Sequence, residues 1–285
     1  MNVLPNLTSL EFAQENAFFF TPVTGKFDKL DLYDYQKNLL ETFDKNRFVL
    51  VKHSRQMGIT TLLKIYLANS ILNNYNKPKT FVLISNNLLQ ACDVLEDIKR
   101  LVKQSYDKDF IVDNKRELTI ENGNRIMVKP PSPEATKSFV IDEIIIDNVN
   151  YVNTLESLFS CIIPTINTNS SKIILISSGR PVNEFLKKLF LPSNDNFVKK
   201  TITWEMNPTR GKEWYDNMKK DLGEDLVRSE IDLIDIDEKP KIKKSVSFRL
   251  ETDLLETMKT KLKYENISLS DYLRNLIKED LSNNH

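Results

Sequence analysis

Between residue 31 and about residue 236, short apolar stretches alternate with longer stretches in which apolar residues recur every three or four positions. The first pattern predicts buried strands and the second predicts helices with one apolar face. Such alternation is typical of an α/β fold with a largely parallel sheet that helices cover on both faces. We expect strands at residues 48–51, 80–85, 125–128, 144–147, 172–177 and 200–204, and helices at residues 37–43, 61–74, 87–104, 155–161 and 211–222.

Composition divides the chain into four segments. Residues 1–30 mix consecutive phenylalanines with turn-forming residues, and we expect them to pack as a cover on the α/β domain of residues 31–236. The chain then becomes charged and contains a proline, which predicts a linker at residues 237–243. Residues 244–285 form a separate small unit. A chain of 285 residues is long enough for one α/β domain with such an appendage.

The bulk composition narrows the class of protein. The 40 basic and 40 acidic side chains cancel, so any contact with DNA must come from a local patch. Cys92 and Cys161 lie far apart in apolar stretches, and we expect two buried, reduced thiols. Two histidines without paired cysteines do not suit a zinc site. No apolar run is long enough for a membrane span and no signal pattern opens the chain, so we expect the protein inside the cell.

A predicted strand, a polar turn (KHSRQMGITT, residues 52–61) and a predicted helix follow one another. Free N–H groups converge at such a turn, where the helix dipole is positive, and this predicts an anion site. In the standard phosphate-binding loop a lysine follows the last glycine, but here Ile59 follows Gly58. Any α/β protein contains strand, turn and helix in this order. The RQMG segment, a lysine and two threonines nevertheless favour a nucleotide-binding loop.

The strand expected at residues 144–147 ends on an acid, Asp147. A nucleotide hydrolase needs an acid there for Mg²⁺ and a neighbouring carboxylate for the attacking water. The neighbour is Asn148, which can bind a water but cannot accept its proton. General-base catalysis contributes about 10²–10⁴-fold, so we expect slow hydrolysis. Asp142 and Glu143 would be the catalytic pair only if the strand were residues 139–141, and we expect them at the opposite end of the sheet.

The order K-x-x-R-Q-x-G-x-T-T resembles the deviant phosphate loop of the large terminase subunits of tailed phages, in which the lysine stands at the start of the loop. The resemblance implies that Lys52 supplies the phosphate-binding charge and that Arg55 stabilises charge on the γ-phosphate. It implies that Thr60 and Asp147 hold Mg²⁺, and that Gln36 recognises the adenine edge. The other loop residues expected to bind ATP are Gln56, Met57, Gly58 and Thr61.

The resemblance covers roughly residues 15–235 and implies a P-loop NTPase-type sheet flanked by helices. Ser177, Ser178 and Gly179 occupy the place of the short motif that couples hydrolysis to movement in that family. The family pattern has an acid where Asn148 stands. A full large terminase continues into an RNase H-like nuclease domain. Because this chain stops about where that domain would begin, we expect no DNA-cutting activity.

Residues 243–280 begin with one alternating strand, followed by two amphipathic stretches, and resemble the ribbon-helix-helix family of DNA-binding domains. So small a unit cannot fold alone, which implies strand-to-strand pairing of two copies. Val246, Phe248 and Leu250 would face the dimer core, and the alternate side chains would enter the DNA major groove. The alternative is a helical hairpin used only for oligomerisation. The residues expected to contact DNA are Lys243, Lys244, Ser245, Ser247 and Arg249.

Our leading hypothesis is a terminase-like ATPase module that binds ATP, Mg²⁺ and double-stranded DNA in the cytoplasm of an infected bacterial host. A separate terminase nuclease, a small terminase or a portal would be its partners, and it would assemble as a ring or as a dimer. The alternative is a non-catalytic DNA-binding or regulatory protein with a degenerate ATPase fold, acting on packaging or on transcription. A helicase-like repair ATPase is disfavoured, because the chain shows no second helicase lobe.

Overall fold

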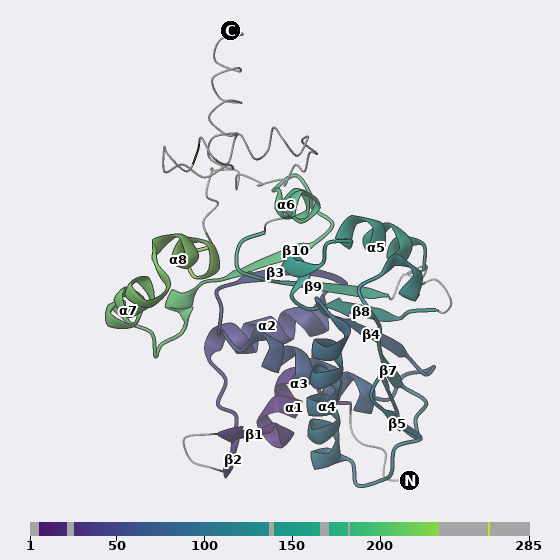
Figure 1. Cartoon of the computed structure of the whole chain (residues 1–285). Coiled ribbons are helices and arrows are strands. Elements are labelled where there is room, and N and C mark those ends of the chain that lie inside the picture. Colours follow the sequence, from purple (N-terminus) through teal and green to yellow (C-terminus); the bar gives the residue numbers. More distant parts are fainter. Residues whose placement is uncertain are drawn as a thin grey trace, which may run out of the picture. The chain divides into compact units, whose positions relative to one another are not determined.

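Among the described residues, an eight-stranded sheet runs through the first of two compact units, Met1–Ile236 and Asp237–His285 (Figure 1). The computed structural model describes residues 6–21, 26–136, 140–165, 171–181, 183–233 and residue 262. The strand order is β10-β3-β9-β8-β4-β7-β6-β5. The strands are β3 (Phe48–His53), β4 (Thr80–Ile84), β5 (Val112–Asn114), β6 (Glu117–Thr119), β7 (Arg125–Val128), β8 (Glu143–Ile146), β9 (Lys172–Ser178) and β10 (Val198–Ile202).

The sheet is parallel from β10 to β7, and β6 and β5 extend it with antiparallel pairing. Every residue of β4 and β8 is buried, because both faces of these strands are covered. The expected mostly parallel sheet flanked by helices is confirmed. The hairpin of β5 and β6 was not expected, because its polar sequence VDNKRELT lacks the apolar run of the other strands.

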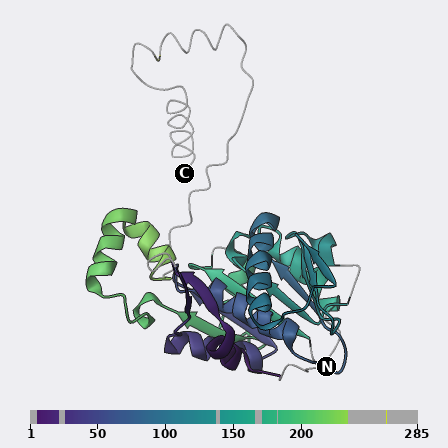
Figure 2. The same ribbon diagram turned by 90° about the horizontal axis from the view of Figure 1, so that it is seen from below.

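Helices cover both faces of the sheet (Figure 1, Figure 2). One apolar core joins one face to α1 (Ser9–Asn16), α2 (Asp34–Lys45), α3 (Ile59–Leu72) and α4 (Leu88–Ser105). A second core joins the other face to α5 (Leu155–Ile162) and α6 (Glu184–Phe190). Figure 1 places α7 (Lys212–Leu222) and α8 (Glu224–Glu230) beyond the carboxyl end of β10. The remaining elements are the hairpin β1 (Phe18–Thr21) and β2 (Lys26–Lys29), and the 3-10 turns η1 (Pro133–Thr136), η2 (Val149–Tyr151), η3 (Ile163–Thr165) and η4 (Trp204–Met206).

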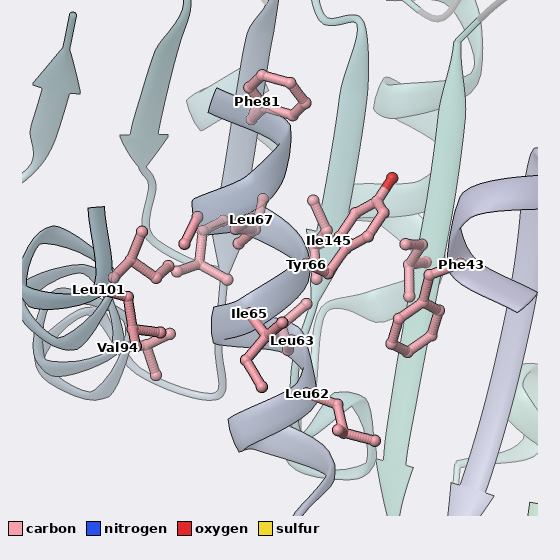
Figure 3. Close-up of a cluster of buried hydrophobic side chains, with 14 of the residues drawn as sticks. Phe43, Leu62, Leu63, Ile65, Tyr66, Leu67, Phe81, Val94, Leu101 and Ile145 are labelled. Atoms are coloured by element: carbon pink, nitrogen blue, oxygen red, sulfur yellow. The ribbon is translucent and has the colours of Figure 1, made fainter. Parts of the chain in front are cut away.

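Helix α3 is the central helix of the first core (Figure 3). Its side chains pack between α4, where Val94 and Leu101 lie, and α2, where Phe43 lies. Its ends differ from the expected residues 61–74, because Gly58 in the left-handed conformation starts the helix at Ile59 and it ends at Leu72. The N-terminal helix α1 buries Phe12 in the same core, so it is part of the core and not only a cover.

The amino-terminal edge of the sheet carries a buried polar network. Glu143, at the start of β8, accepts a hydrogen bond from the Tyr66 hydroxyl at 2.5 Å and pairs with Lys79 at 3.4 Å. Lys172 donates to the Phe43 carbonyl at 3.0 Å. Asp142 lies at the same edge and accepts from a backbone N–H at 2.8 Å. The alternative catalytic pair, Asp142 and Glu143, therefore lies at the edge opposite to the end of β3.

The structure also bears on two expectations drawn from composition, the state of the cysteines and the membrane span. Cys92 and Cys161 are both free thiols, but they are half-buried and not buried as expected. Within the part of the chain that the structure describes, no helix combines the length and the apolar character needed to span a membrane.

We expect Tyr66→Phe to destabilise the protein by about 1–3 kcal/mol, because it removes the hydroxyl donor of a buried carboxylate. Urea-induced unfolding of both proteins at neutral pH measures the difference. Tyr106→Phe is a matched control, since the Tyr106 hydroxyl makes only a 3.3 Å contact with a backbone N–H. Equal losses in the two variants would contradict a special role for the Tyr66–Glu143 bond.

Candidate functional site

The turn of residues 54–58, here called the phosphate loop, joins the end of β3 at His53 to the start of α3 at Ile59. The strand is two residues longer than expected, so Lys52 belongs to the strand and not to the loop. Two loop residues adopt the left-handed backbone conformation, Gln56 with φ 60° and Gly58 with φ 74°. Glycine adopts it at little cost, whereas a glutamine must be held there.

Arg210, which follows η4, holds two backbone carbonyls of the phosphate loop. Its Nη1 donates to the Arg55 carbonyl at 3.1 Å, and its Nη2 donates to the Gln56 carbonyl at 2.7 Å. Its guanidinium also lies 4.3 Å from the centre of the Trp214 ring. In a trans peptide the N–H points opposite to the carbonyl. Carbonyls fixed on Arg210 therefore leave the next N–H groups on the other side of the loop.

The third loop carbonyl, that of Met57, is held from α2. The Tyr35 hydroxyl donates to it at 3.0 Å and the Gln36 Nε2 at 3.3 Å. The Gln36 Oε1 accepts from the backbone N–H of Tyr33 at 3.0 Å, so this buried amide braces both α2 and the loop. A Cβ at Gly58 would lie 2.8 Å from the Gln36 Nε2, so only glycine leaves room for the amide.

The N–H groups of the loop and of the first turn of α3 remain available. Across the described residues, no acceptor takes the backbone N–H groups of residues 56–61, while Leu62 starts the helical pattern by donating to the Gly58 carbonyl at 3.1 Å. Unpaired N–H groups at a helix N-terminus carry positive partial charge. A turn of this kind is an anion site of the phosphate-binding type.

The parallel register brings the end of β8 close to this turn. Asp147 follows β8 and is almost fully buried, and its Oδ2 accepts from the Thr60 hydroxyl at 3.2 Å. The two residues expected to hold Mg²⁺ are thus in contact. Burial raises the pKa of the Asp147 carboxyl to about 6, against hydrogen bonds from Asn148 and Thr60 that lower it. A buried carboxylate with a hydroxyl beside it and too little compensating charge is suited to a cation.

Magnesium bound with a nucleotide needs only one or two protein carboxylates, because phosphates and waters complete its shell. The described residues contain no group of three or more His, Cys, Asp or Glu side chains placed to hold a metal by themselves. Thr60 and Asp147 therefore fit a shared site, in which the protein and a phosphate ligand hold the ion together.

Asn148 follows Asp147 and contacts its carboxylate. Its backbone N–H donates to the Asp147 Oδ1 at 2.9 Å, and its side-chain amide lies 3.5 Å from Oδ2. The amide adds a hydrogen-bond donor beside the carboxylate and supplies no proton acceptor stronger than a carbonyl.

Lys52 points to the face of the sheet opposite α3. It follows Leu50 by two residues, and Leu50 packs in the second core, with α5 and α6. Its ammonium group lies 5.8 Å from the centre of the Phe190 ring of α6. Its expected contact with phosphate stays a prediction, as does adenine recognition by Gln36.

The expected coupling motif, Ser177, Ser178 and Gly179, lies at the carboxyl end of β9, between β3 and β8. The Gly179 N–H donates to the carbonyl of His53, the last residue of β3, at 2.9 Å. The amide of Asn150 donates to the Ser178 carbonyl at 2.7 Å. This turn therefore touches both the strand before the phosphate loop and the segment after Asp147.

Arg55 lies on the loop with its side chain about half exposed, and it contacts Glu230 of α8 and Tyr151 of η2. Sequence patterns did not indicate Arg210, Asn150, Glu230 or Tyr151. Their contacts join residues that are 28 to 175 positions apart in the sequence, and none of the four belongs to a motif. The expected DNA contacts Lys243, Lys244, Ser245, Ser247 and Arg249 lie outside the described residues.

Comparisons with known proteins agree with this architecture. No family model matches the chain. The large terminase ATPase domain of Thermus phage P74-26 superposes with a TM-score of 0.57 and 16% identity, covering 72% of this chain and 94% of that one. The HK97 bacteriophage large terminase gives 0.58 and 14%, covering 80% and 54%. The large terminase of a thermophilic bacteriophage gives 0.57 and 13%, covering 71% and 53%.

The fold is that of the large terminase ATPase domains. This chain spans about half the length of the HK97 and thermophilic-phage terminases that it matches. At such low identity the likeness establishes the fold alone, so the assignment of chemistry rests on the residues described above.

We expect Asp147→Asn to stabilise the protein at neutral pH in the presence of a chelator. The pKa is raised from 3.8 to about 6, so the stability that the protonated carboxyl contributes is full below about pH 4 and is lost as pH rises through 6. Two pKa units correspond to about 3 kcal/mol. Urea-induced unfolding measures the free energy of unfolding of both proteins. Between pH 4 and pH 7, the value of the variant should rise relative to that of the wild type by about 1–3 kcal/mol. A difference between the two proteins that does not change with pH would contradict this expectation.

Proposed function

We propose that this chain is a terminase-like ATPase module that binds ATP together with Mg²⁺. The observation that carries the proposal is the turn of residues 56–61, whose N–H groups lack acceptors among the described residues, next to the Thr60–Asp147 contact. The large terminase of the thermophilic bacteriophage has been solved with ATP-γ-S and with ADP, and this supports a nucleotide as the ligand.

The phosphate groups would lie against the N–H groups of the loop and of the first turn of α3. Thr60 and Asp147 would hold Mg²⁺, which neutralises phosphate charge when bound. Arg55 would supply positive charge at the terminal phosphate. Lys52 would have to leave the ring of Phe190 to reach the same phosphates. Gln36 braces the loop, and its second amide hydrogen and remaining oxygen lone pair are the groups available to an adenine edge.

Hydrolysis would be slow, because Asn148 stands where a general base is needed and its amide cannot accept a proton from water.

For the C-terminal unit we propose a ribbon-helix-helix domain at residues 244–285, as its sequence pattern indicates. This domain would pair two copies of the chain and bring the module to double-stranded DNA. A separate nuclease, a small terminase or a portal would complete a packaging assembly in the infected host.

A second candidate is a regulator that binds nucleotide without turnover. The observation that favours it is that Asn148 contacts the Asp147 carboxylate through its backbone N–H and its side-chain amide. An amide hydrogen-bond donor, and not a second acid, therefore lies beside the carboxylate that would bind Mg²⁺. Such a protein would act on packaging or on transcription through its DNA-binding unit.

Nucleotide binding tests the proposal. A charge-assisted contact contributes about 1.5–3 kcal/mol, so we expect Thr60→Val to weaken Mg²⁺-dependent binding of ATP-γ-S about tenfold to hundredfold by calorimetry. Thr42→Val is the control, because its hydroxyl bonds to the Asn38 carbonyl of its own helix. No binding by the wild type, or equal affinities of the two variants, would refute the proposed site.

Turnover separates the two candidates. Phosphate release should be measured for the wild type, Lys52→Ala and Asn148→Asp, which restores a carboxylate of the same shape. A motor predicts that the wild type is faster than Lys52→Ala. If the wild type is as slow as Lys52→Ala and only Asn148→Asp is active, the regulator is correct and the motor is not.

A further inference from the structure

The side chain of Arg55 is held at two points by residues from distant parts of the chain. Its Nε pairs with the Glu230 Oε2 of α8 at 2.6 Å. Its Nη2 donates to the Tyr151 hydroxyl of η2 at 2.7 Å. A solvated arginine samples many rotamers, whereas two directed bonds to one guanidinium fix its plane and its direction.

The two contacts use two of the three nitrogens of the guanidinium. Glu230 binds Nε and Tyr151 binds Nη2. Among the described residues, Nη1 has no acceptor, so both of its N–H groups remain available, together with the Nη2 N–H that Tyr151 does not take. An arginine binds an oxyanion through N–H groups of this kind.

The position of the Glu230 carboxylate is itself fixed by the backbone around it. The Glu230 carbonyl accepts from the Arg55 N–H at 3.1 Å, and the carbonyls of Ser229 and Ile231 accept from Arg180 and Ser54. The carboxylate lies against Gly179, where a Cβ would be 2.8 Å from its Oε2. The end of α8 is therefore fastened to both the phosphate loop and the turn after β9.

We propose that Glu230, assisted by Tyr151, is a positioning residue that orients Arg55 with its Nη1 free for the terminal phosphate of a nucleoside triphosphate. This inference rests on the proposed function of the site. Glu230 acts through Arg55 and does not touch the phosphate. Its negative charge alone would repel a nucleotide, so the sign of its effect distinguishes positioning from simple electrostatics.

The test compares ATP-γ-S with ADP, which lacks the terminal phosphate, by titrating each with Mg²⁺ into the full chain. The readout is the ratio of the two dissociation constants. The wild type should prefer ATP-γ-S, and Arg55→Ala should abolish the preference. Glu230→Gln should reduce it about threefold to tenfold, the loss expected when a mobile side chain must be ordered on binding. Tyr151→Phe should reduce it less, because it removes a neutral partner.

Glu224→Gln is the matched control, since Glu224 lies in the first turn of the same helix and its carboxylate only approaches Lys219 at 3.7 Å. It should leave the ratio unchanged. In an Arg55→Ala background, Glu230→Gln should have no further effect on the ratio, because it has no arginine left to orient. A variant that lost structure would weaken both nucleotides together, and Glu230→Ala repeats the measurement with the acceptor removed.

Three results would overturn the inference: an unchanged ratio in Glu230→Gln and Glu230→Ala, an effect that persists without Arg55, or tighter ATP-γ-S binding on loss of the carboxylate. The last would make Glu230 a restraint on Arg55. If the wild type binds neither nucleotide, the proposed function fails first. Binding with an unchanged ratio refutes the positioning role alone.

Discussion

The hydrogen bonds that hold three carbonyls of the phosphate loop are the constraint on which the candidate site depends. Arg210 takes the carbonyls of Arg55 and Gln56, and Tyr35 and Gln36 take that of Met57. If these donors were absent, the peptides could rotate and present carbonyls where an anion should lie. The donors come from segments on both sides of the loop in the sequence, so the geometry of the candidate site depends on the contact with Arg210 as well as on α2.

Much of the sheet could be predicted from the sequence, because the information is local. The apolar runs before residues 52 and 147 become β3 and β8, and parallel strands put their carboxyl ends at one edge. The meeting of Thr60 with Asp147 follows from that geometry. Element ends were less predictable, as Lys52 shows, because pairing with β9 and β10 extends β3 beyond its apolar run.

The residues that complete the site could not be predicted, for a physical reason. Arg210, Glu230 and Tyr151 act through side chains that meet the loop only in the folded chain, and none belongs to a periodic pattern. Gln36 illustrates the same limit. Its recognition of adenine stays a prediction, while its amide bonds to the start of α2 and to the loop, and a linear pattern does not reveal these contacts.

Asn148 adopts the left-handed conformation, with φ 54° and ψ 42°. Asparagine and aspartate tolerate this region better than other side chains, and a longer residue there costs about 1–2 kcal/mol. The backbone of the turn after β8 therefore limits which side chains position 148 accepts. An acid would fit there as aspartate without a change of backbone, whereas glutamate would add this conformational cost.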